Sequence, residues 1–458
     1  MQNAPYRSNR GEKAMKNPKA LMIPFGYPGY PPEILKKFRD GSRNHLKRLG
    51  IDVTATANVI DFADARRIRD QVNTTDCEFV VVVVLSWIEA TNVIEVIRDL
   101  SHKPILLWSH TMWQEKGEFL TLGPIPGAGV LRQAFEELRY KFKFVYGQPG
   151  DKSLDDDIAV FARAAHAYHQ LRRTRIGLLG YMSMGMYSAA FDHLGLLRDW
   201  GPEVDQLDQY VLVKRLEAVT KTQVAPLIAK AKRDWDITKK VRPRDLEITL
   251  KMYLAMKALV KERRWDCLTI KCQYELSKEF GYTPCVPLSM LGNELPCSCE
   301  GDIPLIAAQI AMHHITGQIV AYGDIHTVEP NGVIMGACGF APFKMGEGRP
   351  KVDRTETLYQ GLANCTIYKE GEITFARMGY TPDRKLKMHV AFGKTHRPRA
   401  FHEIGCLPYP SMEVDLPGLG DQFAQGMLSQ HYSIVYGDCR AELRELLRLS
   451  DIEGVFVE

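Results

Sequence analysis

The sequence predicts an α/β fold in three parts, with two doubly wound α/β domains followed by a β-rich, barrel-like domain. Three observations support this division. Strand-like and helix-like segments alternate from Ala20 onward, the alternation restarts at residues 175–181 (RIGLLGY), and helical periodicity disappears after Gly317. Alternating strands and helices are typical of parallel sheets with right-handed crossovers, whereas short strands between turns are typical of antiparallel sheets or barrels.

The first predicted domain covers residues 1–172, of which 1–19 are expected to be flexible. Its third strand contains the run from Phe79 to Leu85, which is almost continuously apolar and β-branched. Such a run indicates a parallel strand that is buried on both faces. The strands are predicted at residues 20–26, 51–60, 77–87, 103–110 and 143–147, with helices at 32–50, 61–72 and 130–142 and another after the third strand.

The second predicted domain covers residues 173–318. After the strand RIGLLGY comes a loop rich in Met, Gly and Ser at residues 182–192. This loop matches neither G-x-G-x-x-G nor G-x-x-x-x-G-K-[ST], so it gives little support to a nucleotide site. Residues 214–261 are predicted to be helical with a break at 235–245, and residues 265–272 (WDCLTIKC) to form the next strand.

The third predicted domain, residues 319–458, consists of short apolar runs between Gly-containing and Asn-containing turns. This pattern predicts an antiparallel sheet or barrel, followed by a final helix at residues 439–451. The strand-like runs are residues 317–324, 332–340, 364–371, 372–380, 385–394, 410–416 and 431–438.

Composition narrows the class of protein. The 59 basic and 55 acidic side chains leave a net charge of only +4, and no basic tail is present, so nucleic acid is not an expected partner. The longest apolar run is far shorter than a membrane span, and no signal peptide is recognised. We therefore expect a cytoplasmic protein without a membrane partner.

The ten cysteines are expected to be reduced. Cys285, Cys297 and Cys299 raise the question of a zinc site, but the CSC spacing differs from the usual CxxC and no second cysteine pair follows. Buried, inert thiols are the favoured interpretation.

Polar side chains that could take part in catalysis or metal binding are concentrated in the stretch from Trp265 to Pro342. Carboxylates and histidines at the ends of buried strands are common in the active sites of α/β proteins. A helix cap or a solvated turn is the alternative explanation for each. The side chains are Glu275 after an apolar run, Glu300 and Asp302 in the turn CEGD before an apolar helix, and Asp324 and His326 after the run QIVAYGD.

This order of parts, with these motifs, resembles the L-fucose isomerase and L-arabinose isomerase superfamily. Members of that superfamily have two Rossmann-like α/β domains followed by a β-rich C-terminal domain. The resemblance extends from about Leu21 to Leu449. It is carried by residues 175–192, by 270–277 (IKCQYELS), by 299–302 (CEGD), by 323–342 (GDIHTVEPNGVIMGACGFAP) and by 431–438 (HYSIVYGD).

The resemblance implies a divalent-metal-dependent aldose–ketose isomerase, an intramolecular oxidoreductase of carbohydrate metabolism that acts through an enediolate. It implies Mn²⁺ or another divalent cation held by Glu275, Glu300 and His431, with Asp302 as the alternative to Glu300. Glu275 is the implied proton-transfer residue and Glu300 its partner. Two carboxylates and an imidazole suit Mn²⁺. No nicotinamide or flavin is required.

The resemblance also bears on the substrate and on assembly. Trp87, Met184 and His326 are the candidates for substrate binding. Family members often carry a histidine before the Cys-Gly pair, where Ala337 stands here, so the choice of sugar is open. The resemblance implies a homo-oligomer, specifically a homohexamer, in which Trp87 would face a neighbour's site and stack on a sugar. Core or interface packing is the alternative role for Trp87.

Two other functions fit the same sequence. One is an isomerase of an anionic or unusual aldose such as a sulfonated hexose, for which Arg397 and Arg399 could pair with the charge. The other belongs to a different class, a non-catalytic sugar-binding protein on the same scaffold.

Overall fold

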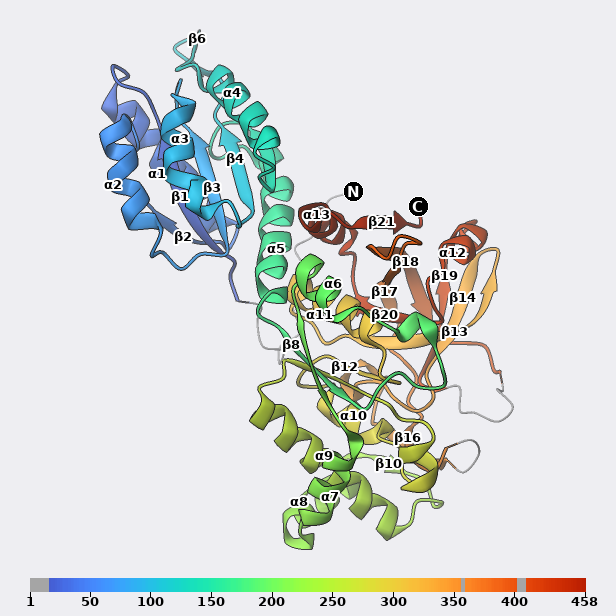
Figure 1. Ribbon diagram of the computed structural model, residues 1–458. Helices are drawn as coiled ribbons and strands as arrows, with labels where there is room; N and C mark the ends of the chain where they lie inside the picture. The colour runs from blue at the N-terminus through green and yellow to red at the C-terminus, as the bar shows by residue number, and fades with distance from the viewer. Residues whose placement is uncertain (1–15, 356–358, 402–408) are drawn as a thin grey trace. The chain divides into compact units, whose positions relative to one another are not determined.

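The computed structural model describes residues 16–355, 359–401 and 409–458, and within them the chain divides into two compact units (Figure 1). One unit contains residues 16–170 together with 441–450. The other contains residues 171–440 and 451–458. The mixed α/β class predicted from the sequence is confirmed. The predicted flexible segment 1–19 lies largely outside the described residues, and the first strand begins at Lys19.

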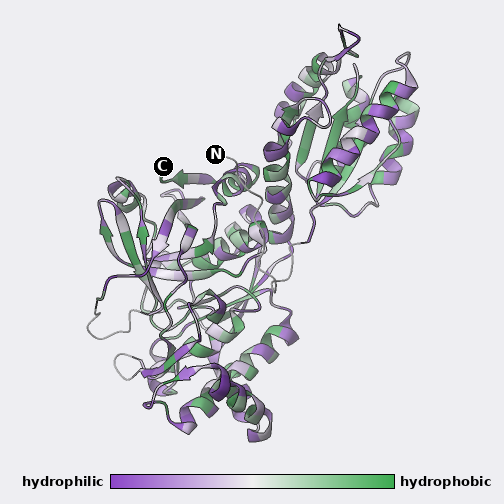
Figure 2. Cartoon of the chain, turned by 180° about the vertical axis from the view of Figure 1, so that it is seen from behind, coloured by the Kyte–Doolittle hydropathy of each residue, from purple (hydrophilic) through white to green (hydrophobic). Residues whose placement is uncertain are grey.

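The unit that begins at residue 16 is built on a parallel sheet with the strand order β2-β1-β3-β4-β7 in its described part. All six residues of β3 are buried, which confirms the prediction made from the valine run. Figure 2 shows these apolar strands flanked by helices of mixed polarity. The strands are β1 (Lys19–Phe25), β2 (Asp52–Ala55), β3 (Phe79–Val84), β4 (Ile105–Ser109) and β7 (Phe142–Tyr146), with a small hairpin of β5 (Trp113–Glu115) and β6 (Glu118–Leu120).

Helices connect these strands, and one more joins the unit from the far end of the chain. Arg163 on α5 donates to Glu442 on α13, and the Lys141 ammonium donates 2.6 Å to the carbonyl of Leu449. These bonds explain why residues 441–450 belong to this unit. The helices are α1 (Pro32–Arg48), α2 (Phe62–Val72), α3 (Ala90–Ile97), α4 (Pro124–Glu137), α5 (Asp155–Leu171) and α13 (Arg440–Ser450).

The other unit opens with a second parallel sheet, in the order β12-β11-β8-β9. The strands are β8 (Arg175–Leu179), β9 (Glu203–Leu207), β11 (Cys267–Ile270) and β12 (Cys297–Cys299). The helices of this part are α6 (His193–Asp199), α7 (Gln209–Ala218), α8 (Lys221–Asp234), α9 (Pro243–Arg263), α10 (Cys285–Leu291) and α11 (Ile303–Thr316).

A closed barrel follows in the same unit. In the described residues its six strands run in the order β17-β20-β13-β14-β19-β18, and β18 pairs again with β17 to close the ring. This confirms the predicted barrel-like region. The strands are β13 (Ala321–Glu329), β14 (Gly332–Gly336), β17 (Gly371–Tyr380), β18 (Leu386–His396), β19 (Ser411–Asp415) and β20 (His431–Tyr436), with β21 (Glu453–Phe456) added beside β18 and α12 (Gly420–Gly426) before β20. A small separate sheet contains β10 (Asp236–Ile237), β15 (Lys351–Thr355) and β16 (Gly361–Asn364).

Helix α11 connects the parallel sheet to the barrel. It packs against β11 and β12 on one side and against β17 and β20 on the other. Its sequence, IPLIAAQIAMHHIT, is apolar on almost every face, which is the pattern of a helix buried all round. The predicted boundary at residue 318 therefore falls just after a helix that both neighbouring layers share. The predicted boundary at residue 172 lies next to residue 171, where the unit that contains α11 begins. No helix in the described residues is long and apolar enough to cross a membrane.

Asp245 provides a test of how α9 is held. Its buried carboxylate accepts hydrogen bonds from the backbone and guanidinium of Arg242 and from the Tyr282 hydroxyl, and it pairs with Arg354. Burial alone would raise the pKa of Asp245, but the hydrogen bonds from Arg242 and Tyr282 lower it to about 2.

We expect Asp245→Asn to lower the free energy of unfolding at pH 7 by about 2–3 kcal/mol, because charged hydrogen bonds are lost in a buried position. A carboxylate with a lowered folded-state pKa stabilises the fold above its unfolded pKa of about 3.9, and this contribution disappears as the pH falls through about 2. Urea unfolding across this pH range measures the difference. Asp383→Asn, at an exposed turn, is the control, and an equal loss in both variants would contradict the assignment.

Candidate active site

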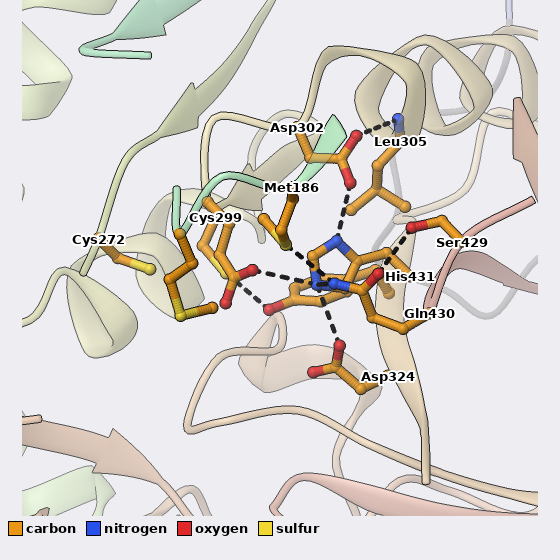
Figure 3. A network of polar contacts seen from close by, with 12 residues as sticks. Met186, Cys272, Cys299, Asp302, Leu305, Asp324, Ser429, Gln430 and His431 are labelled. Atoms are coloured by element: carbon orange, nitrogen blue, oxygen red, sulfur yellow. Dashed lines mark hydrogen bonds and ion pairs between the residues drawn. The ribbon is translucent and has the colours of Figure 1, made fainter. Parts of the chain in front are cut away.

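Four ionisable side chains meet where the parallel sheet joins the barrel, and Figure 3 labels three of them, Asp302, Asp324 and His431. Glu300 and Asp302 follow the carboxyl end of β12, Asp324 lies on β13, and His431 is the first residue of β20. The carboxyl ends of parallel strands are the edge at which α/β proteins bind ligands. Pairing of Asp324 with His431 across β13 and β20 brings the barrel side chains to the same point.

His431 is the centre of this cluster. Its Nδ1 lies 2.8 Å from Asp302 Oδ2, while its Nε2 lies 3.0 Å from Asp324 Oδ1 and 3.3 Å from Glu300 Oε2. The ring is buried and stands edge-on to Tyr322 at 5.3 Å between centroids. Burial alone would lower the pKa of His431, but Asp324, Glu300 and Asp302 outweigh it and raise that pKa well above its usual value.

Asp302 fixes the orientation of the imidazole. One of its oxygens accepts from the Leu305 backbone N–H (3.0 Å) and caps α11, and the other accepts from Arg377 (2.6 Å) and faces His431 Nδ1. Burial would raise the pKa of Asp302, but Arg377 and His431 lower it to about 2. Because Nδ1–H donates to an ionised Asp302, Nε2 is the ring nitrogen directed toward Glu300 and Asp324.

Arg377 is a fully buried cation within β17. Besides Asp302, it donates to the backbone carbonyl of Ser188 at 2.6 Å. Ser188 in turn lies in the loop after β8, and its hydroxyl is 2.9 Å from that of Ser429. The loop, the barrel and the cap of α11 are thus joined through one guanidinium. An arginine inside an apolar strand-like run was the sequence signal for this role, and the sequence analysis did not use it.

The backbone turn around Glu300 directs its carboxylate inward. Glu300 has a left-handed φ of +67°, which is unusual for a bulky residue and costs of order 1 kcal/mol. A Cβ at Gly301 would lie 2.2 Å from the carbonyl oxygen of Tyr181, so only glycine allows this close approach. Glu300 Oε1 accepts from the Gln273 amide (2.7 Å), whereas the buried Oε2 has no hydrogen-bond partner among the described residues.

These atoms fit a divalent cation. The three carboxylates outnumber the cationic Arg377 and His431, so this buried group has a net negative charge whether or not Nε2 of His431 carries a proton, which is costly without a counter-ion. Two ligand atoms that each lie about 2.1 Å from one cation, with a right angle between the two bonds, are about 3 Å apart. His431 Nε2 lies at a similar distance from the nearest oxygens of Asp324 and Glu300. Glu300, Asp324 and His431 therefore form a donor set suited to Mn²⁺. Both oxygens of Asp302 are engaged elsewhere.

The predicted ligands are not all brought together. Glu300 and His431 meet, but the Glu275 carboxylate is about half exposed (54%) and pairs with Lys271 instead. The hydrogen bond from Lys271 lowers the pKa of Glu275. Tyr274, with φ +68°, redirects the chain before Glu275, so that Gln273 rather than Glu275 contacts Glu300. The third side chain on His431 is Asp324, which the sequence had marked only as a strand-end carboxylate.

Glu275 lines a separate pocket of about 410 Å³ beside the carboxyl ends of β8 and β9. The Lys271 ammonium that pairs with it lies 3.8 Å from the ring centroid of Tyr181, a residue that also lines this pocket. The proton-transfer role of Glu275 stays a prediction.

The three candidates for substrate binding make none of the contacts just described. Trp87 follows β3 in the unit that begins at residue 16, and the residue is 38% exposed. Met184 lies in the loop after β8, with its sulfur 3.8 Å from the Tyr359 hydroxyl. His326 lies on β13 with its ring 5.5 Å from that of Phe401. Their roles in binding stay predictions.

Two glutamines that the sequence analysis did not select complete the surroundings of the cluster. Gln430 Nε2 lies 3.3 Å from His431 Nε2 and 2.9 Å from the sulfur of Met186, and Gln273 contacts Glu300. Gln430 precedes the predicted ligand His431 directly, and Gln273 lies within the motif IKCQYELS, so proximity to a motif was the available signal.

No protein-family model matches the chain. Curated relatives are named sulfoquinovose isomerase. The protein from Alkalicoccus urumqiensis is 23% identical over 368 residues, which cover 78% of this chain and 81% of that protein. The protein from Priestia aryabhattai is 21% identical over 456 residues, covering 96% and 99%. The protein from Clostridium sp. (strain MSTE9) is 21% identical over 369 residues, covering 78% and 81%.

These relatives confirm the predicted class: the protein is an enzyme, an isomerase of the aldose–ketose type. The L-fucose isomerase and L-arabinose isomerase superfamily remains a resemblance at this level of identity.

Replacement of Arg377 tests the connection between loop, helix and barrel. We expect Arg377→Met to lower the free energy of unfolding by about 3 kcal/mol or more, because the buried charge of Asp302 loses its arginine and keeps only His431 and the Leu305 backbone N–H as partners. Lys385→Met, at the exposed turn between β17 and β18, should change it by less than about 0.5 kcal/mol. Urea unfolding of both variants measures the effect, and equal stabilities would refute the role of Arg377.

Proposed function

We propose that this protein interconverts sulfoquinovose, a sulfonated aldohexose, with the corresponding ketose, and that Glu300, Asp324 and His431 hold the divalent cation, such as Mn²⁺, that the reaction uses. The observation that carries the metal site is the buried, unbonded Glu300 Oε2 beside His431 Nε2. The substrate is supported by the shared name of relatives that match 78–96% of the chain. This favours the charged-aldose alternative over L-fucose or L-arabinose.

Aldose–ketose isomerisation moves a proton between C2 and C1 of the open-chain sugar and shifts the carbonyl in the opposite direction. A bound divalent cation polarises the carbonyl and the neighbouring hydroxyl and stabilises the negative charge that develops as the proton leaves. The chain's residues have to remove the proton from one carbon and return it to the next.

Asp324 is the best-placed proton carrier. Its side chain is 22% exposed, whereas those of Glu300, Asp302 and His431 are at most 5% exposed. A carboxylate must reach substrate to take a proton from it, and Asp324 is the accessible carboxylate of the four-residue cluster. Asp302 and Arg377 hold His431 in one orientation, and Gln273 holds Glu300. Glu275 is the second candidate for the proton transfer.

A sulfonate is charged throughout the physiological pH range and needs a cationic partner. Arg399 is held by Glu413 and Glu329, so its guanidinium is already neutralised. Arg397 is exposed and has its backbone N–H bonded to Glu370. Of the two arginines selected from the sequence, Arg397 is therefore the better candidate for the sulfonate. The homohexamer implied by the resemblance stays a prediction.

Asp324→Asn and Glu275→Gln separate the two versions of the metal site. We expect Asp324→Asn to weaken Mn²⁺ binding by about tenfold or more and to lower turnover by about 10²–10⁴-fold. Glu275→Gln should keep the affinity of the wild type for Mn²⁺. Calorimetric titration of chelator-treated protein measures the affinity, and an isomerase assay measures turnover. Loss of Mn²⁺ binding in Glu275→Gln alone would restore the ligand set predicted from the sequence.

A substrate panel tests the sugar. Sulfoquinovose should be isomerised with a kcat/KM about 10–100 times that for D-glucose, because a charged hydrogen bond contributes about 1.5–3 kcal/mol. L-Fucose and L-arabinose complete the panel, with Mn²⁺ present and ketose detected by NMR. Faster turnover of either neutral L-sugar would reject the sulfonated substrate. Sugar binding without formation of any ketose would favour the non-catalytic alternative.

A further inference from the structure

We propose that Cys272, Cys299 and Glu300 form a second cation site, selective for a soft or borderline divalent cation such as Zn²⁺, and that this site competes with the Mn²⁺ site for Glu300. The binding of the cation follows from the geometry alone. Its consequence, inhibition of the isomerase by Zn²⁺, rests on the proposed function.

The three ligand atoms already lie close together. The two sulfur atoms and a carboxylate oxygen of Glu300 are all within 4.8 Å of one another. Cys299 is the last residue of β12 and pairs in register with Ile270, the last residue of β11. Cys272 lies two residues after Ile270. Neighbouring parallel strands thus bring the two thiols to one edge of the sheet, beside the four-residue cluster (Figure 3).

One atom of this group, Glu300 Oε2, makes no hydrogen bond within the described part of the chain and faces His431 Nε2 at 3.3 Å. The thiol of Cys299, in contrast, lies 2.6 Å from the Tyr322 hydroxyl. All three proposed ligands are at least nine-tenths buried. Cys272 donates to Gln273 Oε1 at 2.8 Å, while the amide nitrogen of Gln273 donates to Glu300. Gln273 therefore connects Cys272 and Glu300 through hydrogen bonds, and a cation would connect the same two residues directly.

Ligand chemistry separates the two sites on either side of Glu300. Thiolates select soft and borderline cations such as Zn²⁺ and Cd²⁺, whereas carboxylates with imidazole suit Mn²⁺. Two thiols and one carboxylate leave an open fourth position for water in a tetrahedral site. Each thiol gives its proton to solvent as it takes the cation, so the ion meets two thiolates and a carboxylate.

The neighbouring thiol of Cys338 points to a route of entry. Cys338 is half-buried, and it interacts with the thiol of Cys299. The row of thiols therefore leads from a partly accessible residue to the two buried ones. The sequence raised the question of zinc at Cys285, Cys297 and Cys299, whereas the structure places Cys299 beside Cys272, which follows the adjacent strand β11.

Cadmium binding tests the site directly, because a cadmium–thiolate bond has an ultraviolet charge-transfer band that needs no enzymatic activity. Wild-type protein titrated with Cd²⁺ should show this band and saturate at one ion per chain. Cys365→Ser, which removes a partly buried thiol elsewhere, is the matched control and should behave as the wild type. Cys272→Ser and Cys299→Ser should each lose most of the band, with Cd²⁺ affinity reduced about tenfold or more.

An unchanged band in both Cys272→Ser and Cys299→Ser, or its loss in Cys365→Ser, would overturn the proposal. If the two variants do not fold, cadmium NMR of the wild type decides instead. A resonance in the range of sites with two sulfur ligands supports the site, and one in the range of oxygen and nitrogen ligands alone rejects it.

The effect on Mn²⁺ is measured separately. Zn²⁺ should release bound Mn²⁺ from the wild type, and the electron paramagnetic resonance of free Mn²⁺ measures this release. The Zn²⁺ concentration needed should be about tenfold or more lower for the wild type than for Cys272→Ser. Equal concentrations for both would overturn the shared use of Glu300. An inactive protein that still shows the cadmium–thiolate band would reject the proposed isomerase while leaving the second site intact.

Discussion

The buried carboxylate of Asp302 makes the contacts on which the unit containing residues 171–440 depends. One carboxylate caps α11, accepts from Arg377 on β17 and orients His431 on β20. It therefore joins the parallel sheet, through the helix that follows β12, to two strands of the barrel. Because all of these groups are buried, removing any partner would leave a charge without compensation. The geometry of the site and the association of the two layers have the same physical origin.

The charge of the cluster accounts for its proposed chemistry. Three carboxylates face one arginine and one histidine, so folding alone leaves excess negative charge in a buried place. Burial of uncompensated charge is costly, and a divalent cation would offset it. The same excess charge raises the pKa of His431 despite its burial. A site of this kind is preorganised to hold charge that changes during a reaction.

Glu300 occupies an unusual position between two kinds of ligand. On one side it meets His431, which Asp324 also contacts, and on the other it meets Cys272 and Cys299. Its left-handed backbone and the glycine after it place the carboxylate between the sheet edge and the barrel. Oxygen and nitrogen atoms on one side and sulfur atoms on the other favour different cations. One strained turn therefore determines the immediate surroundings of both proposed sites.

Much of the fold could be predicted from sequence because local patterns carry it. The valine run of β3, the restart at RIGLLGY and the short strands after Gly317 each correspond to elements of the structure. The apolar helix α11 was also recognisable, since its burial follows from the absence of a polar face. Strand order, barrel closure and the return of α13 to the other unit depend on long-range pairing, which local patterns do not encode.

For the candidate site, the sequence indicated the class of enzyme and, through the family resemblance, selected Glu300 and His431, which lie in motifs at strand ends and which the structure brings together. Only the tertiary structure decided that Asp324, and not Glu275, lies beside them. The reason is the conformation of a few residues: a left-handed Tyr274 redirects Glu275 toward Lys271, while the β13–β20 pairing places Asp324 against His431. Strand register and single backbone dihedrals position side chains, and neither is visible in residue types or spacing.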